Sequence, residues 1–273
     1  MQPDYLLPQH EDPLDSPANA YGGLVSVITP VHNEPAYLVR AVESVAAQTV
    51  PVYEHIVIDD GSSDSTPDVL ERLSRRYPHL VALGHSRRGA AVARNVGITV
   101  ARGRYIAFLD ADDVWHKRKV ERQIEFMETH DCAFSYGDYE EVEHRTRAHI
   151  TRYRLPGTVG HDQLLRGCPI GCLTVAYNQE VLGKRYMPVV PSGHDWGLWL
   201  DLTRDGLKAR KYPGLEASYS NGRSSLSSRK LRKVLHIYRL YRTREKLPRA
   251  RALLRATEHA LVALFKKARL IYS

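Results

Sequence analysis

The stretch YIAFLDADDVW (Tyr105–Trp115) decides how the rest of this chain is interpreted. Its apolar run, Tyr105–Leu109, predicts a buried strand, and three carboxylates follow within four residues. Burying unpaired charges costs far more than one strand gains, so these carboxylates must lie at the strand's exit and face something positive. The spacing of Asp110 and Asp112 suits Mg²⁺ or Mn²⁺, which prefer oxygen ligands. A solvated acidic turn has the same local pattern, so the surrounding sequence must decide.

The size and composition predict a globular protein. A chain of 273 residues is long enough for one large domain or two closely joined halves. Its three cysteines (Cys132, Cys168 and Cys172) are too few for a disulfide framework and lack a histidine cluster at zinc-ligand spacing. We expect them to be reduced, as in the cytoplasm. The polar, proline-containing start carries no secretory pattern, and no apolar run of about 18 residues predicts a membrane span.

The positive charge is concentrated near the C-terminus. The formal net charge is +8, yet residues 223–273 alone contain 15 Lys+Arg and only 2 Asp+Glu. The other 222 residues contain 24 Lys+Arg and 29 Asp+Glu, a slightly acidic balance. The basic character therefore belongs to the C-terminal segment, and any anionic partner is expected there.

The N-terminal part predicts strands that alternate with helices. Residues 1–22 are predicted to be a flexible lead-in, and the first strand is predicted over Leu24–Thr29, stopped by Pro30. A helix over Ala36–Gln48, strands over Tyr53–Ile58 and Leu80–Gly84, a helix ending near Tyr77, a helix over Ala90–Ala101 and the Tyr105–Leu109 strand follow. This alternation predicts a mostly parallel sheet with helices on both faces.

Polar loops follow three of these strands: His32-Asn33-Glu34, Asp59-Asp60 and the acidic turn after Leu109. The carboxyl ends of parallel strands share one edge, where ligands gather, so one crevice should collect all three loops. The chain has no glycine fingerprint of dinucleotide enzymes and no P-loop lysine motif. A carboxylate-lined phosphate site needs a metal to invert its charge. The pattern therefore favours a nucleoside diphosphate carried with a cation.

Four motifs stand at the strand ends and on the helix between them: SVITPVHNE (Ser26–Glu34), IDDGSSDST (Ile58–Thr66), ARNVGI (Ala93–Ile98) and FLDADD (Phe108–Asp113). Together they resemble those of the family 2 glycosyltransferases with the GT-A fold, of the bacterial cell-surface polysaccharide type. They occur in the family's order and spacing over about residues 24–115, and a weaker match extends to about 228. The resemblance implies a donor half over residues 23–115 and an acceptor half over 116–228 of one domain.

The resemblance also implies roles for individual residues. Pro30 and His32 would line the nucleobase pocket, where the family commonly has tyrosine in place of His32, and Asp60 would hydrogen-bond the base. Arg88 and Arg94 would contact the diphosphate or donor sugar, and Glu34 and Ala111 are placed in the same donor site. Asp110 would touch the ribose or sugar and share the metal with Asp112. From the residues alone, Arg94 is equally compatible with pairing to a sheet-end acid, and His32 with an exposed loop.

In the acceptor half, a helix is predicted over His116–His130 and strands over Cys132–Tyr136 and Glu140–Ile150. The stretch Ser192–Leu202 predicts a helix anchored by its tryptophans, with Asp195 in the first turn. A rigid carboxylate at the edge of a cleft suits a general base for an alcohol, although an N-cap is the structural alternative.

The resembled family usually opens this helix with a Glu-Asp pair whose aspartate deprotonates the acceptor hydroxyl. Asp195 matches that aspartate, and His194 stands in place of the usual glutamate. His194 and Trp196 are predicted to contact the acceptor. The stretch Tyr219–Ser227 matches the family's closing loop loosely. A histidine often found there near the metal is missing, and Asn221 or Arg223 is the candidate replacement.

Residues 229–273 predict two basic amphipathic helices. Such helices can lie on an anionic membrane surface with snorkelling cations, or cover the catalytic domain with their apolar faces. Nucleic acid is not expected, because no nucleic-acid motif accompanies the charge.

The sequence is thus interpreted as a metal-dependent, inverting glycosyltransferase with Mn²⁺ or Mg²⁺ as cofactor. It would move a sugar, most readily from a UDP-sugar, to a hydroxyl of a glycan or lipid-linked acceptor, in the cytoplasm or at the inner face of the membrane. Two other classes stay open, namely a non-catalytic nucleotide-sugar or glycan-binding module and a sugar nucleotidyltransferase. The second usually has a glycine-rich basic loop after the first strand, and Val31–Pro35 is not one.

Overall fold

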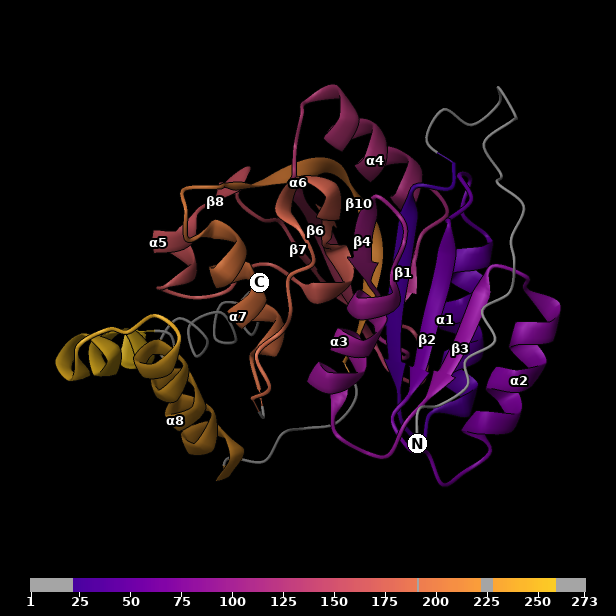
Figure 1. Ribbon diagram of the computed structural model, residues 1–273, viewed down its shortest axis with the longest axis horizontal. Helices are drawn as coiled ribbons and strands as arrows, with labels where there is room; N and C mark the ends of the chain where they lie inside the picture. The colour runs from indigo at the N-terminus through magenta and orange to yellow at the C-terminus, as the bar shows by residue number, and fades with distance from the viewer. Residues whose placement is uncertain (1–21, 191, 222–227, 259–273) are drawn as a thin grey trace.

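The computed structural model describes residues 22–190, 192–221 and 228–258. Its strands form one sheet in the order β3-β2-β1-β4-β9-β6-β10-β5, while β7 pairs with β6 and β8 with β10. Figure 1 shows helices on both faces of this sheet. The predicted α/β class is confirmed, and the predicted lead-in over residues 1–22 lies almost entirely outside the described residues.

The first four strands pair in parallel, as predicted. They are β1 (Val25–Val31), β2 (Glu54–Asp59), β3 (Leu80–Gly84) and β4 (Tyr105–Phe108), connected by α1 (Pro35–Ala46), α2 (Thr66–Arg76) and α3 (Ala90–Val100). Pro30 does not stop β1, contrary to the prediction. It lies beyond Ile28, the last β1 residue paired with β4, so its missing N–H removes no hydrogen bond from that ladder.

Alternating side chains distribute the core over the two faces of the sheet. Ile28, Ile56 and Ile106 pack with α3 on one face, and Val27 and Ala107 pack with helices of the other face. Helix α3 approaches the sheet closely, since a Cβ on its Gly97 would come within 2.6 Å of the Ile28 side chain. This contact fixes the helix that carries Arg94.

The remaining strands make the sheet mixed. The further elements are β5 (Val114–Trp115), α4 (Lys119–Thr129), β6 (Phe134–Glu143), β7 (His149–Tyr153), β8 (Thr158–Val159), α5 (His161–Leu164), β9 (Ala176–Asn178), α6 (Gln179–Leu182), α7 (His194–Thr203) and β10 (Ala209–Asn221). Strand β9 runs antiparallel to both β4 and β6, whereas β6 and β10 are parallel.

The strands predicted over Cys132–Tyr136 and Glu140–Ile150 are wrong in their limits. One long strand, β6, runs through Gly137, and a turn over residues 144–148 interrupts the second predicted strand before β7 begins. Gly137 continues the strand because the ring of Tyr212 packs against it, at 2.5 Å from where a Cβ would stand.

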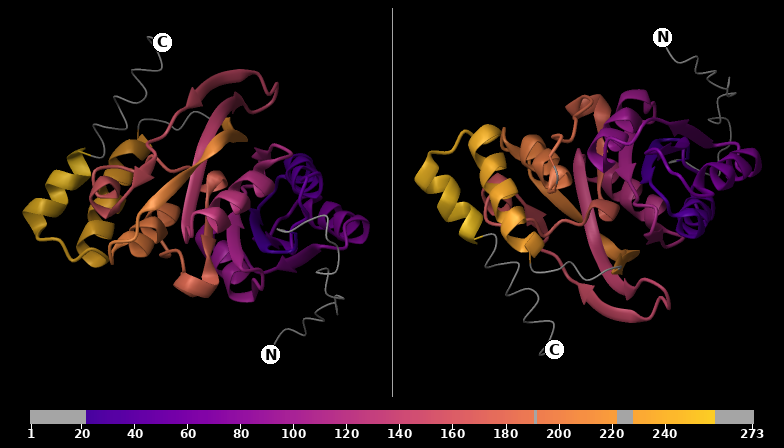
Figure 2. Two further views of the ribbon diagram at one scale, coloured as in Figure 1. Left: turned by 90° about the horizontal axis from the view of Figure 1, so that it is seen from above. Right: turned by 90° about the horizontal axis from the view of Figure 1, so that it is seen from below.

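The helical C-terminal segment packs on the acceptor half. Helix α8 (Ser228–Thr243) and a second helix over residues 249–258 lie at the end of the molecule far from β3 (Figure 2). Leu240, Tyr241, Ala252 and Ala256 are buried in the same core cluster as Trp196 of α7. The prediction that this segment covers the catalytic domain is therefore confirmed for its buried face. The predicted contact with a membrane stays a prediction.

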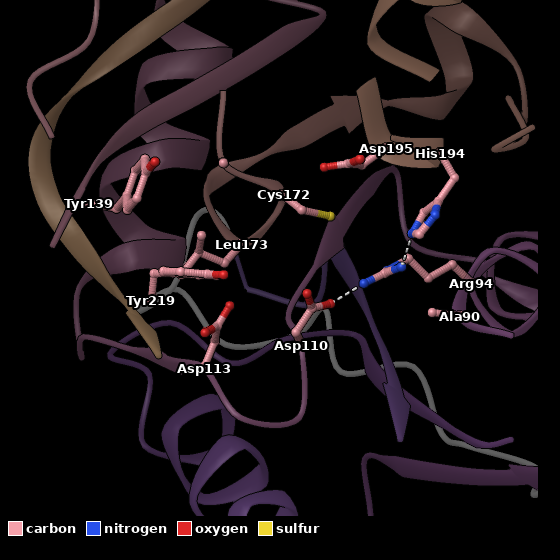
Figure 3. Close-up of a pocket in the computed structure, with 11 residues that line it drawn as sticks. Ala90, Arg94, Asp110, Asp113, Tyr139, Cys172, Leu173, His194, Asp195 and Tyr219 are labelled. Atoms are coloured by element: carbon pink, nitrogen blue, oxygen red, sulfur yellow. Dashed lines mark hydrogen bonds and ion pairs between the residues drawn. The ribbon is translucent and has the colours of Figure 1, made fainter. Parts of the chain in front are cut away.

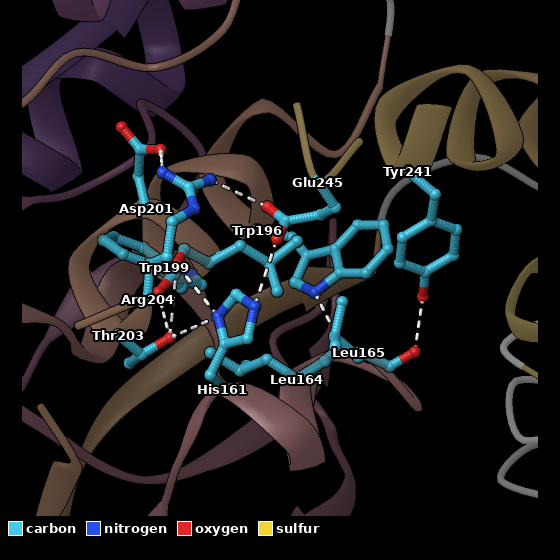
Figure 4. Close-up of polar contacts among 11 residues, drawn as sticks. His161, Leu164, Leu165, Trp196, Trp199, Asp201, Thr203, Arg204, Tyr241 and Glu245 are labelled. Carbon is cyan, nitrogen blue, oxygen red and sulfur yellow. Dashed lines mark hydrogen bonds and ion pairs between the residues drawn. The ribbon is translucent and has the colours of Figure 1, made fainter. Parts of the chain in front are cut away.

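Polar contacts fix the same junction (Figure 4). The Tyr241 hydroxyl donates to the Leu165 carbonyl at 2.6 Å. The Glu245 carboxylate lies 2.9 Å from an Arg204 guanidinium nitrogen and 3.1 Å from His161 Nε2. In the described part of the chain, no helix combines the length and apolarity that crossing a membrane requires.

Candidate active site

The acidic turn predicted from the sequence lies at the end of β4, where the parallel strands meet the second half of the sheet. The Asp113 backbone N–H donates to the Asp110 carbonyl at 3.0 Å, which closes the turn. The Asp113 carboxylate is buried and accepts the Ser220 N–H at 2.8 Å. The Asp112 side chain is 30% exposed, so it is available to a ligand.

The buried guanidinium of Arg94 joins this turn to α7. It forms an ion pair with Asp110 and donates to His194 Nε2 at 2.7 Å (Figure 3). Both burial and the Arg94 charge lower the pKa of His194, so its imidazole is neutral near pH 7 and accepts this hydrogen bond. Arg94 therefore pairs with a sheet-end acid, as one of the two alternatives predicted, and also with His194, while its contact with the donor stays a prediction.

A cavity of about 350 Å³ opens beside this bridge. Asp195 reaches it from the first turn of α7, while Asp110 and Asp113 reach it from the turn after β4 (Figure 3). The remaining lining residues are Ala90, Arg94, Tyr139, Gly171, Cys172, Leu173, His194 and Tyr219. One cavity thus brings together the predicted base and Asp110, which lie 85 residues apart in the sequence, whereas Asp112, the other predicted acid, is not among its lining residues.

Trp196, predicted to contact an acceptor, lies in the core instead of lining this cavity. Its indole N–H donates to the Leu164 carbonyl at 3.0 Å, and its ring meets Tyr241 edge-on at 5.4 Å (Figure 4). Trp196 therefore supports α7 from behind, and His194 and Asp195 on the preceding positions are held rigidly.

Two of the predicted donor residues line a second cavity, of about 620 Å³. His32 and Glu34 line it, together with Asn33, Tyr37, Arg87, Glu143, His144, Arg145 and Asn221. Asp60 is buried and accepts the backbone N–H groups of Arg88 and Gly89 at 2.7 and 2.8 Å. Asp60 therefore shapes the loop after β3. Pro30 lies within β1, and Ala111 is buried against α1 and α2.

The electrostatics of the acidic turn favour a cation. Burial and the neighbouring carboxylates of Asp110 and Glu34 raise the pKa of Asp112 to about 7. Burial and the carboxylates of Asp110 and Asp112 raise the pKa of Asp113 well above its ordinary value. Within the described residues, no three or more metal-ligating side chains are grouped to hold an ion by themselves. The donor set fits a cation that one or two carboxylates share with the oxygens of a ligand.

Sequence reasoning missed two residues beside this turn. His144 Nδ1 lies 3.9 Å from an Asp112 carboxylate oxygen, and Arg147 donates to the Ser220 hydroxyl. Both come from the turn between β6 and β7, which was predicted to be strand. The uninterrupted polar run from Glu143 to Arg147 is the signal that predicts a turn there.

Comparison with known proteins identifies the family. The family model described as "Glycosyl transferase family 2" matches residues 26–184. The chain belongs to this family. It is therefore a glycosyltransferase, as the sequence motifs predicted.

Two curated relatives of this glycosyltransferase come from bacteria. A Bacillus subtilis protein named "Putative teichuronic acid biosynthesis glycosyltransferase TuaG" is 38% identical, over 82% of this chain and 89% of the relative. An Escherichia coli protein, WfgD, is 35% identical over 77% of this chain and 82% of the relative. Its name describes a UDP-Glc:alpha-D-GlcNAc-diphosphoundecaprenol beta-1,3-glucosyltransferase.

Solved structures share the fold at low sequence identity. Staphylococcus aureus TarS 1-349 in complex with UDP-GlcNAc superposes with a TM-score of 0.64, at 20% identity, over 84% of this chain and 69% of that one. A Pyrobaculum calidifontis mannosyltransferase, PcManGT, in complex with GDP-Man and Mn²⁺ has a TM-score of 0.61, at 18% identity, over 95% of this chain and 85% of that one. These glycosyltransferase structures support the predicted GT-A architecture.

Proposed function

We propose that this glycosyltransferase moves a sugar from a UDP-sugar to a hydroxyl of a glycan or lipid-linked acceptor, with inversion, in the synthesis of a bacterial surface polysaccharide. The observation that carries the proposal is the shared cavity, in which Asp195 faces the acidic turn across the Arg94 bridge. The relatives named for teichuronic acid synthesis and for transfer from UDP-Glc to a diphosphoundecaprenol acceptor support the substrate classes.

The two halves would divide the substrates between them. Residues 23–115 would hold the nucleotide-sugar, with His32 and Glu34 in the 620 Å³ cavity and Asp110 at its sugar end. Residues 116–228 would hold the acceptor beside Asp195. Asp60 would fix the loop that carries Arg88 and Gly89, and its hydrogen bond to the base stays a prediction.

In the proposed reaction, the Asp195 carboxylate takes the proton of the acceptor hydroxyl. The hydroxyl oxygen forms the new bond to the anomeric carbon while the bond from that carbon to the diphosphate oxygen breaks. The departing nucleoside diphosphate keeps the electron pair, and one displacement inverts the anomeric centre. The anchored first turn of α7 holds the base in place, which reduces the entropy lost on reaching the transition state.

A divalent cation, Mn²⁺ or Mg²⁺, would be held by Asp112 with help from Asp110. When bound, it supplies charge stabilisation to the leaving diphosphate. The raised pKa of Asp112 beside two other carboxylates supports this assignment, because a cation relieves that crowding. The Asp112→Ala variant should lose most turnover, and unchanged turnover would remove the metal from the mechanism.

The donor is tested by thermal unfolding with UDP, GDP, dTDP, CMP and NAD, each with and without Mn²⁺. A ligand at about 100 times its Kd should stabilise the protein by about 2.7 kcal/mol. We expect a shift with UDP that grows with Mn²⁺. If another nucleoside diphosphate raises the unfolding temperature instead, its base replaces uracil in the proposed donor. If none of the nucleotides raises the unfolding temperature, the transferase proposal is contradicted. Pyrophosphate release from NTP and sugar phosphate would favour a nucleotidyltransferase.

The site of action is proposed to be the cytoplasmic face of the membrane. The exposed side of the 249–258 helix carries Arg249 and Arg251 with Leu253 and Leu254, which suits an anionic lipid surface. An acceptor on a lipid carrier would be presented at that surface.

A further inference from the structure

We propose that the turn between β6 and β7, residues 144–148, belongs to the donor site, and that Arg147 is a fixed cation for the donor's diphosphate. The inference rests on the proposed function, because it names further residues for the same substrate. None of the four sequence motifs contains this turn, and only the folded chain brings it to the acidic loop.

The backbone and contacts of Arg147 hold it at the acidic turn. Arg147 adopts a left-handed conformation, with φ of 61°, which turns its side chain back toward β10. Its guanidinium donates to the Ser220 hydroxyl, and this hydroxyl donates to the Asp112 carbonyl. The Ser220 backbone N–H donates to the Asp113 carboxylate at 2.8 Å. Ser220 thus links Arg147 to both Asp112 and Asp113 through hydrogen bonds.

His144 ties the other end of the turn to the first loop of the donor half. Its ring lies 4.0 Å from the ring of Tyr37, centroid to centroid, and its Nδ1 lies 3.9 Å from an Asp112 oxygen. Tyr37 belongs to α1, which begins immediately after Glu34. The β6–β7 turn therefore spans the acidic loop and the loop that carries His32.

The local charge suits a diphosphate. A nucleoside diphosphate and the Asp112 carboxylate together carry more negative charge than one divalent cation offsets. The charged residues that line the adjoining 620 Å³ cavity are two arginines, Arg87 and Arg145, and two acids, Glu34 and Glu143, so this lining alone offers no excess of positive charge. Arg147 adds a planar guanidinium, whose paired N–H groups match phosphate oxygens. The β6–β7 turn would thus supply cationic groups that remain in place as the leaving group departs.

The test is calorimetric binding of UDP and uridine to the wild type and to Arg147→Gln, Arg147→Lys and Arg152→Gln, with and without Mn²⁺. Arg152 lies exposed on β7 of the same hairpin and is the matched control. We expect Arg147→Gln to bind UDP about ten- to a hundredfold more weakly, both with and without metal, as for a lost hydrogen bond to a charged group. Uridine binding should be unchanged, and Arg147→Lys should recover part of the loss.

Each outcome decides between the two proposals. If the wild type binds neither UDP nor another nucleoside diphosphate, the proposed function fails. If the wild type binds UDP and Arg147→Gln binds it equally well, the role of Arg147 is overturned. Equal losses for UDP and uridine would show a structural role only. Should Arg147→Gln unfold, the ratio of UDP to uridine affinity in Arg147→Lys decides in its place.

Discussion

The guanidinium of Arg94 shows how one residue links the two sides of the site. It is 4% exposed and holds Asp110 on one side and His194 on the other. Because His194 is neutral, it places no second positive charge beside the guanidinium and accepts its hydrogen bond. The Arg94 bridge therefore sets the distance between Asp110 and the first turn of α7.

At the same scale, Asp195→Asn should lower kcat by about 10²- to 10⁴-fold, because the amide cannot accept the acceptor's proton. The affinity for UDP should not change, since Asp195 lies on α7, away from the 620 Å³ cavity. Initial rates and calorimetry measure the two quantities. Asp201→Asn, on the same helix but outside the cavity, is the control and should keep full activity. A modest fall in kcat for Asp195→Asn would contradict the role of Asp195 as the base.

His55 should make the stability depend on pH. Burial and, to a lesser degree, the His79 charge lower its pKa from 6.5 to about 3. The folded-state pKa lies below the unfolded one, so below about pH 6.5 the unfolded chain binds a proton that the folded chain does not. The free energy of unfolding should fall by about 2 kcal/mol from this group between pH 7 and pH 5.

Denaturant unfolding of the wild type and of His55→Gln at pH 7 and pH 5 tests this expectation. Glutamine can still pair with the Thr29 hydroxyl, which lies 2.9 Å from His55 Nε2. The variant should lose about 2 kcal/mol less than the wild type over this range. Identical losses in both proteins would show that other groups cause the acid sensitivity.

The sequence was sufficient to predict the acidic turn and Asp195 as members of one site, because short motifs mark both. It was not sufficient for Arg147, because that residue reaches the site only through the β6–β7 hairpin and the end of β10. Contacts between segments that far apart in sequence depend on strand pairing, which has no local signal.

At the scale of elements, the parallel part of the sheet was predictable because apolar runs and helical stripes alternate regularly there. The second part was harder, since β6 carries Gly137 and Asp138 where a turn is expected. Asp138 is satisfied by Lys211 of β10, at 3.1 Å, and Gly137 makes room for Tyr212. Lys211 and Tyr212 both belong to the neighbouring strand β10, so the local sequence of β6 could not predict that the strand continues through Gly137 and Asp138.

Helix α8 should contribute to the stability of the whole acceptor half. Tyr241 is fully buried, and its hydroxyl donates to the Leu165 carbonyl. Tyr241→Ala should lower the free energy of unfolding by about 3–5 kcal/mol, as for other large-to-small core changes. Leu254→Ala, at a side chain 56% exposed, should stay within about 0.5 kcal/mol of the wild type. Similar small effects for both variants in chemical unfolding would mean that α8 is only loosely attached.

At the scale of the whole molecule, the C-terminal segment combines a packed face with a basic outer face. Residues 228–258 carry 11 Lys+Arg and 2 Asp+Glu. Their apolar side chains are divided, because Ala252 and Ala256 are buried while Leu253 and Leu254 are more than half exposed. Removing the segment would uncover the core around Trp196, so a truncation cannot separate membrane binding from folding. Substitutions of exposed side chains can separate membrane binding from folding.

We expect the full chain to bind vesicles that contain anionic lipid and to bind neutral vesicles weakly. Each basic side chain near such a surface contributes about 1 kcal/mol, so Arg249→Gln with Arg251→Gln should lower partitioning about ten- to thirtyfold. Leu253→Ser with Leu254→Ser should lower it further, because their insertion adds apolar burial.

Arg152→Gln with Arg154→Gln, at exposed positions near β7, is the charge-matched control. Sedimentation at two salt concentrations measures the effect, which should weaken as ions screen the surface. Equal loss in the control pair would mean that net charge, and not the helical face, draws the protein to the membrane.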